Sequence, residues 1–388
     1  MDTQNTPVHM RLWHRGFWLL AFANLLLTMS VYMLVPLMGD WQQDVWGLAP
    51  TVQGLLMSAY GLGLFVLGPF CSWWVQRYRR NHVCLWAVVG ILLVVAAFWL
   101  VQSNHASWNI LPWHFAALRM LLGATFGLAQ MVLSSTLIID VCESFQRTEA
   151  NHSSAWFSRF ALSLGPMLAL VAARRLHADA TLVALALAAL AAVLIAMVSF
   201  PFRAPEERLH LMSLDRFLLP QGWVLAVNLL LAAAVAGYLL AVERNPMFYA
   251  MMMSGFFLAL LAERFIFPDA DLKSEPIAGF LLMGAALLIR QQPVTEASVY
   301  LAPVFMGLGI GLIGSRFLLF FIKLSHHCQR GTSQSTFFLT WEMGIALGLF
   351  LGYASPKTFH QVSEILLVVA LLLYNFFTHG WYLRSKNR

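Results

Sequence analysis

The sequence predicts an all-α integral membrane protein with twelve transmembrane helices in two pseudo-symmetric six-helix halves. Three observations support this fold class: a strongly apolar composition, twelve apolar runs of spanning length, and a repeat between the two halves of the chain. Of the 388 residues, 60% are hydrophobic and 11% are charged. A soluble protein of this length needs more charged residues on its surface, whereas side chains that face lipid do not. The composition therefore excludes a soluble enzyme and a disordered chain.

A membrane-spanning helix needs about 20 apolar residues, because each residue advances the helix by about 1.5 Å through a hydrocarbon core of about 30 Å. By this criterion the sequence contains twelve candidate spans. They lie near 16–38, 50–75, 83–102, 112–140, 154–173, 179–201, 222–242, 247–266, 276–292, 297–324, 332–354 and 359–382. The first run is too long for the core of a signal peptide and is interpreted as a span.

A polar stretch from Arg203 to Gln221 separates the sixth span from the seventh. We therefore expect an N-terminal six-helix bundle at 1–202, a cytoplasmic linker at 203–221 and a C-terminal six-helix bundle at 222–388.

The distribution of Lys and Arg predicts the orientation of the chain. If the N-terminus is cytoplasmic, 16 of the 24 Lys and Arg residues fall in inner segments, 5 fall in outer loops, and the other 3 (Arg119, Arg159 and Arg316) lie within spans. Basic residues accumulate on the cytoplasmic side of membrane proteins. We therefore expect both termini in the cytoplasm, and we interpret the net charge of +6 as a sign of topology, with no nucleic-acid partner.

The two halves share short matching segments. Gln146-Arg147 follows the fourth span, and Gln329-Arg330 follows the tenth at an offset of 183 residues, which also places Gly165 on Gly348. Asn24 in the first span similarly matches Asn228 in the seventh. Two parallel six-helix repeats form a known transporter architecture, in which similar bundles rock about a central site.

The loop between the second and third spans contains Gly68-Pro69, followed by Arg77, Arg79 and Arg80. This pattern resembles the loop motif of the major facilitator superfamily, in which basic residues and an acid form a latch on the cytoplasmic side. Gln76 stands where the motif has its acid. The alternative is an ordinary basic loop that follows the positive-inside rule.

Motifs in the fourth and fifth spans extend the resemblance. Arg119, Gly123 and Gly127 share one helix face and resemble the fourth-helix motif of the family. The resemblance implies that Arg119 lines the cavity and that the glycines permit close helix packing; a purely structural arginine is the alternative. Gly165-Pro166 in the fifth span resembles part of a motif associated with exporters, although Ala161 and Ala169 replace the surrounding glycines.

The repeat places two opposite charges at equivalent positions. Arg159 lies twelve residues after Arg147, and Glu342 lies twelve after Arg330, so both are expected near the middle of the membrane. Charged groups at this depth are costly unless they face the protein interior. Glu342 is the acidic residue that we place deepest in a span, and it is the candidate site of protonation. Whether Arg159 and Glu342 form a pair stays open.

Other polar and aromatic residues within the predicted spans could complete a substrate cavity, and hydrogen bonds between helices are the alternative role for each. They include Asn24, Tyr32, Tyr60, Gln130, Asn228 and Trp341. The sequence contains no P-loop, HExxH or GxSxG motif. We therefore predict no enzyme activity, no cofactor and no bound metal.

Together these features predict a secondary active transporter that moves a small organic solute by alternating access, coupled to protons or another ion, with efflux slightly favoured. An uptake symporter for a sugar, peptide or organic anion is the alternative, followed by an intramembrane enzyme or a transporter-like sensor. The expected partners are a small-molecule substrate, protons and the lipid bilayer. The expected state is a monomer, multi-pass in a bacterial inner membrane.

Overall fold

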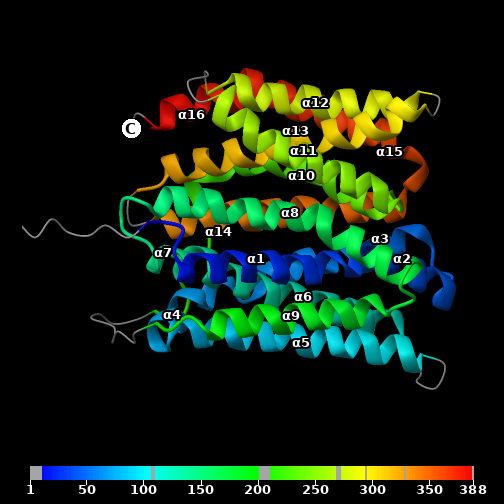
Figure 1. Cartoon of the computed structure of the whole chain (residues 1–388), viewed down its shortest axis with the longest axis horizontal. Helices are drawn as coiled ribbons and strands as arrows, with labels where there is room; N and C mark the ends of the chain where they lie inside the picture. The colour runs from blue at the N-terminus through cyan, green and yellow to red at the C-terminus, as the bar shows by residue number, and fades with distance from the viewer. Residues whose placement is uncertain are drawn as a thin grey trace, which may run out of the picture.

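The computed structural model describes residues 11–105, 110–200, 210–267, 272–292, 295–326 and 329–386, and these residues form helices joined by short connections. Ten helical segments among them are long and apolar enough to cross a membrane. The shorter apolar helix α9 (Ala180–Ala196) and α12 (Ser274–Gln291) run alongside them and bring the number of crossings to twelve (Figure 1). The predicted all-helical membrane fold is confirmed.

The first six crossings contain the helices α1 to α9, and three of these crossings are interrupted. Their bounds are α1 (Arg15–Tyr32) with α2 (Leu34–Trp46), α3 (Pro50–Val66) with the 3-10 turn Gly68–Phe70 and α4 (Cys71–Arg77), α5 (Arg80–Asn104), α6 (Pro112–Val132) with the π-helix Leu133–Leu137 and α7 (Ile138–Asp140), α8 (Arg147–Arg174), and α9.

The last six crossings contain α10 to α16. Their bounds are the 3-10 turn Pro220–Gly222 with α10 (Trp223–Val242), α11 (Pro246–Phe265), α12, α13 (Glu296–Leu324), α14 (Arg330–Ala354), and the 3-10 turn Pro356–Thr358 with α15 (Phe359–Leu373), the π-helix Tyr374–Thr378 and α16 (His379–Lys386). Of the predicted linker, residues 203–209 lie outside the described part of the chain, and residues 210–219 connect to the turn at Pro220.

The break in the first crossing has a local cause. Proline lacks an N–H group, and its ring clashes with the carbonyl four residues earlier. Pro36 therefore disrupts the helix at Tyr32, which is the last residue of α1. The helix then continues as α2 to Trp46, past the expected end at residue 38, because Asp40, Gln42 and Gln43 are polar but compatible with a helix that extends beyond the hydrocarbon core.

The helices pack as two groups with a shared middle layer. In Figure 1 the blue-to-green helices of the first crossings lie below and the yellow-to-red helices above, with α8 and α14 between them. Within the groups, α1 packs on α8 and α9, α3 on α6, α10 on α14 and α15, and α11 on α13. The pairs α3–α14 and α8–α11 join the groups. We call the end that carries residue 15 and α16 the terminal end, and the other the opposite end.

Candidate functional site

A narrow cavity lies between the two groups of helices. Its volume is about 30 Å³, enough for about two water molecules. The lining side chains come from α1, the fourth crossing, α8 and α14. They are Asn24, Tyr32, Gln130, Ser134, Ala155, Ser158, Arg159, Gln334, Phe337, Phe338, Trp341 and Glu342. Six of the twelve, namely Asn24, Tyr32, Gln130, Arg159, Trp341 and Glu342, are candidate site residues from the sequence.

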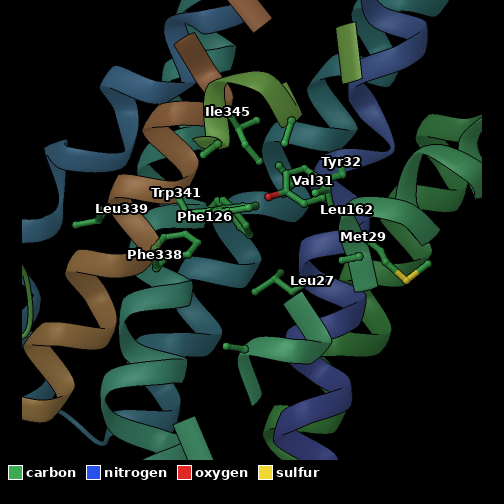
Figure 2. Close-up of a cluster of buried hydrophobic side chains, with 14 of the residues drawn as sticks. Leu27, Met29, Val31, Tyr32, Phe126, Leu162, Phe338, Leu339, Trp341 and Ile345 are labelled. Atoms are coloured by element: carbon green, nitrogen blue, oxygen red, sulfur yellow. The ribbon is translucent and has the colours of Figure 1, made fainter. Parts of the chain in front are cut away.

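Glu342 of α14 is held by two tyrosines of the other group of helices. The hydroxyl of Tyr32 at the end of α1 donates to Oε1 at 2.5 Å, and the hydroxyl of Tyr60 on α3 donates to Oε2. Glu342 as a whole is 2% exposed. Figure 2 shows Tyr32 extending from α1 toward Trp341 and Phe126 on the facing side. Hydrogen bonds to a carboxylate are stronger than those between neutral groups, so this triad ties α14 to α1 and α3.

Arg119 lies behind this triad and is not among the residues that line the cavity. Its Nη2 donates to the backbone oxygen of Met57 at 2.9 Å, and its guanidinium lies 5.3 Å from the centre of the Tyr60 ring. The residue is buried between α6 and α3. In this position Arg119 orients Tyr60, which in turn holds Glu342.

Arg159 borders the cavity but is not paired with Glu342 in the described structure. Its guanidinium lies 4.7 Å from the centre of the Trp156 ring, and the residue is 4% exposed. Within the described residues, Nε, Nη1 and Nη2 all lack a hydrogen-bond partner. A buried guanidinium with no acceptor is costly, and it is suited to an anionic group that enters the cavity.

The repeat-related asparagines occupy different environments. Asn24 lines the cavity, donates to the backbone oxygen of Ser154 at 3.0 Å and accepts from the hydroxyl of Ser158 at 3.0 Å. Asn228 is fully buried between α10 and α15, where it donates to the backbone oxygen of Ala370 at 2.9 Å. Gln130 lines the cavity and donates to Thr28.

The glycines named from the sequence lie at close helix contacts. A Cβ atom at Gly127 would lie 2.7 Å from the backbone oxygen of Leu64, and one at Gly123 would overlap the backbone oxygen of Tyr60. In α8, a Cβ atom at Gly165 would lie 3.1 Å from Cβ of Tyr32, and Pro166 follows inside the helix. The Gly165-Pro166 pair therefore packs against α1 where it presents Tyr32 to the cavity.

The two groups of helices touch on both sides of the cavity. At the opposite end, the Tyr353 hydroxyl of α14 donates to the backbone oxygen of Val35 at 2.7 Å, and Arg244 forms an ion pair with Asp40 at 3.1 Å. Nearer the terminal end, the Phe126 and Phe338 rings meet with centroids 5.6 Å apart. The structure is therefore closed around the cavity.

The loop motif lies at the terminal end. Gly68 begins a 3-10 turn, Arg77 ends α4, Arg79 caps α5, and Arg80 forms an ion pair with Asp140.

A second acid near this motif, besides Asp140, comes from the linker. Gln76 donates to the Ser72 hydroxyl at 3.0 Å, and that hydroxyl donates to Asp215 at 3.2 Å. The sequence alone could not associate Asp215 with the loop motif, because 139 residues separate Gln76 from Asp215.

A second charged cluster, which sequence reasoning did not identify, joins α8 to α11, α12 and α13. Nε2 of His152 lies 2.5 Å from the Ser315 hydroxyl and 3.5 Å from a carboxylate oxygen of Glu263. Arg316 forms an ion pair with the buried Glu275. This ion pair holds Arg316 inside the bundle.

Comparisons with known proteins agree with this architecture. The family model described as "Major Facilitator Superfamily" matches residues 20–349. A comparison with curated proteins found no matching sequence.

Three solved structures are similar in fold. The human organic anion transporter MFSD10 (TETRAN) has a TM-score of 0.65 and 16% identity, and the match covers 93% of this chain and 99% of that chain. The nucleoside transporter NupG has a TM-score of 0.62 and 11% identity, with 96% and 99% covered. A bacterial homologue of the human lysosomal transporter Spinster, solved in an inward-facing and unoccupied conformation, has a TM-score of 0.62 and 12% identity, with 96% of each chain covered.

Proposed function

Because this chain belongs to the Major Facilitator Superfamily and is a secondary transporter of small solutes, we propose that it moves a small organic solute by alternating access and couples this movement to protons through Glu342. The observation that supports this proposal most directly is the hydrogen-bonded triad of Glu342 with Tyr32 and Tyr60 across the cavity. A carboxylate accepts hydrogen bonds more strongly than a neutral carboxyl group. Protonation of Glu342 therefore weakens the tie between α14 and the first group of helices.

The moving bodies in this proposal are residues 1–202 and 222–388, with the terminal end facing the cytoplasm of a bacterial cell and with the monomer as the working unit. The central cavity of about 30 Å³ is too small for an organic solute, so the halves must separate to admit one. Opening of the opposite end requires the loss of the Arg244–Asp40 pair and of the bond from Tyr353 to Val35.

We favour efflux, since Gly165-Pro166 resembles part of the exporter motif and packs against α1 at Tyr32. Uptake of an organic anion is the alternative that a specific observation favours. Arg159 presents a buried guanidinium without a hydrogen-bond acceptor at the cavity wall. At 11–16% identity the similar structures support the fold, and their substrates do not transfer to this chain.

The proposal is tested in liposomes that contain the purified protein and a pH-sensitive dye. Solutes are first selected by the rise in melting temperature that they cause. We expect a selected solute to accumulate under an imposed pH gradient and to move protons when it is added without a gradient. Solute movement that neither follows a pH gradient nor displaces protons would refute the coupling to protons.

We expect Arg159→Ala to reduce transport of an anionic solute by about 10- to 100-fold, because a hydrogen bond to a charged group contributes about 1.5–3 kcal/mol. Initial transport rates are compared with those of Arg174→Ala, which removes an exposed arginine at the end of the same helix. Arg159→Lys keeps the charge and should retain part of the activity. If Arg159→Ala transports at the rate of Arg174→Ala, Arg159 has no role in binding.

A further inference from the structure

A second cavity, of about 330 Å³, lies between the halves at the terminal end. Its charged lining comes from four separate parts of the chain: the start of α5, the end of the fourth crossing with the start of α8, the linker, and the start of α14. It contains four arginines and two aspartates, namely Arg80, Arg147, Arg216, Arg330, Asp140 and Asp215. None of these residues lines the central cavity.

Each of the two aspartates forms an ion pair with one of the four arginines. Arg80 forms an ion pair with Asp140, and Arg216 lies 3.6 Å from the neighbouring Asp215. Within the described residues, neither Arg147 nor Arg330 takes part in an ion pair, and Nε of Arg147 is buried without a hydrogen-bond partner. Two positive charges of the lining are therefore not balanced by an acid of the lining.

These two arginines stand at unfavourable positions in their helices. Arg147 is the first residue of α8, which has 28 residues, and Arg330 is the first residue of α14, which has 25. The N-terminus of a helix carries a partial positive charge that destabilises a cation and stabilises an anion. The first turn of α14 contains no acidic residue, and the acid in the first turn of α8, Glu149, is exposed.

The linker completes the cavity between the halves. The backbone N–H of Arg216 donates to the Thr332 hydroxyl of α14 at 2.9 Å, and its Nη1 donates to the Thr136 hydroxyl of the fourth crossing at 2.6 Å. Phe217 covers Gly68, and the backbone N–H of Leu219 donates to Thr336 at 2.8 Å. An anion in this cavity would touch the first half, the linker and the second half together.

We propose that this cavity binds a phosphate group, which bridges Arg147, Arg216 and Arg330 and holds the terminal end of the transporter closed. A phosphate presents oxygens in several directions, so it can accept from guanidinium groups and helix N-termini on opposite walls. A carboxylate presents two oxygens in one plane and suits a single arginine better. The phosphate belongs either to a soluble phosphate or to the headgroup of an anionic phospholipid.

Ligand binding to the closed state raises its stability and thereby slows opening at this end. The site is a regulatory one, and its occupancy does not depend on which solute the central cavity transports.

The test measures the melting temperature of the purified full-length protein in an uncharged detergent. One arm compares inorganic phosphate with sodium chloride at equal ionic strength. The other compares micelles supplemented with phosphatidylglycerol with micelles supplemented with phosphatidylcholine. We expect a rise of about 2 °C or more in at least one arm. A rise with phosphate identifies a soluble ligand, and a rise with phosphatidylglycerol alone identifies a lipid.

The double variant Arg147→Gln with Arg330→Gln should lose this rise. The matched control, Arg11→Gln with Arg384→Gln, removes two exposed arginines at the same end and should keep it. If the double variant does not fold, each single variant should lose more than half of the rise. The proposal is overturned if neither arm raises the melting temperature, or if the rise persists in the Arg147 and Arg330 variants. Because no transport is measured, failure here leaves the proton-coupling proposal untouched, and the reverse also holds.

Discussion

Glu342→Gln is expected to abolish accumulation driven by a pH gradient while counterflow exchange of the same solute continues. Glutamine has nearly the shape of glutamate and can still accept a hydrogen bond from Tyr32 or Tyr60, so the cavity remains assembled. It cannot change its charge, so the tie between α14 and the first group of helices no longer responds to protons. We expect a loss of at least about tenfold in accumulation, equivalent to about 1.4 kcal/mol.

The control for this variant is Glu296→Gln, which makes the same chemical change at an exposed position in the first turn of α13. Both proteins are reconstituted at equal density, and accumulation and counterflow are measured on the same vesicles. Full accumulation in Glu342→Gln would exclude Glu342 as the coupling residue. Loss of both activities would show that the carboxylate binds the solute or maintains the fold.

The fold class was predictable from the sequence because a bilayer imposes its requirements locally. Each span needs its own apolar run, so composition alone marks nearly every crossing. The exceptions follow from the same physics. The apolar run near 16–38 ends before Asp40 and the two glutamines that follow it, yet α2 continues to Trp46. The length of an apolar run indicates how much of a helix contacts hydrocarbon, and the helix itself can be longer.

The sequence indicated that Arg159 and Glu342 lie at equivalent levels of their helices, but not how each helix is rotated about its axis. Both residues line the central cavity. The sequence also could not show that Asn228 faces α15, or that Arg119 lies behind Tyr60. These outcomes depend on how each helix is turned toward its neighbours, which is set by long-range packing.

The two phenylalanines of the cavity wall had no signal in the sequence. Phe337 and Phe338 are two of 29 phenylalanines, and an apolar ring can face lipid, core or substrate at little difference in cost. The acids of the second cluster, Glu263 and Glu275, lie near span ends and were not distinguishable from ordinary interfacial residues. Only their tertiary contacts, of Glu263 with His152 and of Glu275 with Arg316, distinguish these two acids from such interfacial residues.

Gly63→Ala is expected to lower the melting temperature markedly and to reduce the yield of folded protein. A Cβ atom at Gly63 would overlap the backbone oxygen of Met120 and lie 3.0 Å from the backbone nitrogen of Ala124, so α3 and α6 must separate to accommodate it. Forcing extra atoms into a well-packed contact costs about 1–3 kcal/mol, and we expect the upper part of this range because the neighbours are backbone atoms that cannot change rotamer. The separation would also move Tyr60, which lies on α3 three residues before Gly63 and donates to Glu342.

The matched control is Gly284→Ala in α12, where a Cβ atom would meet nothing within 4 Å. In that open position alanine gains up to about 1 kcal/mol over glycine from its higher helix propensity, so the melting temperature should stay constant or rise. The same substitution is therefore expected to lower stability at Gly63 but not at Gly284, and the difference isolates the packing of α3 against α6 from the intrinsic effect of replacing glycine. Equal melting temperatures for the two variants would contradict the close approach of these helices, and with it the position of Tyr60 on which the proton-coupling triad depends.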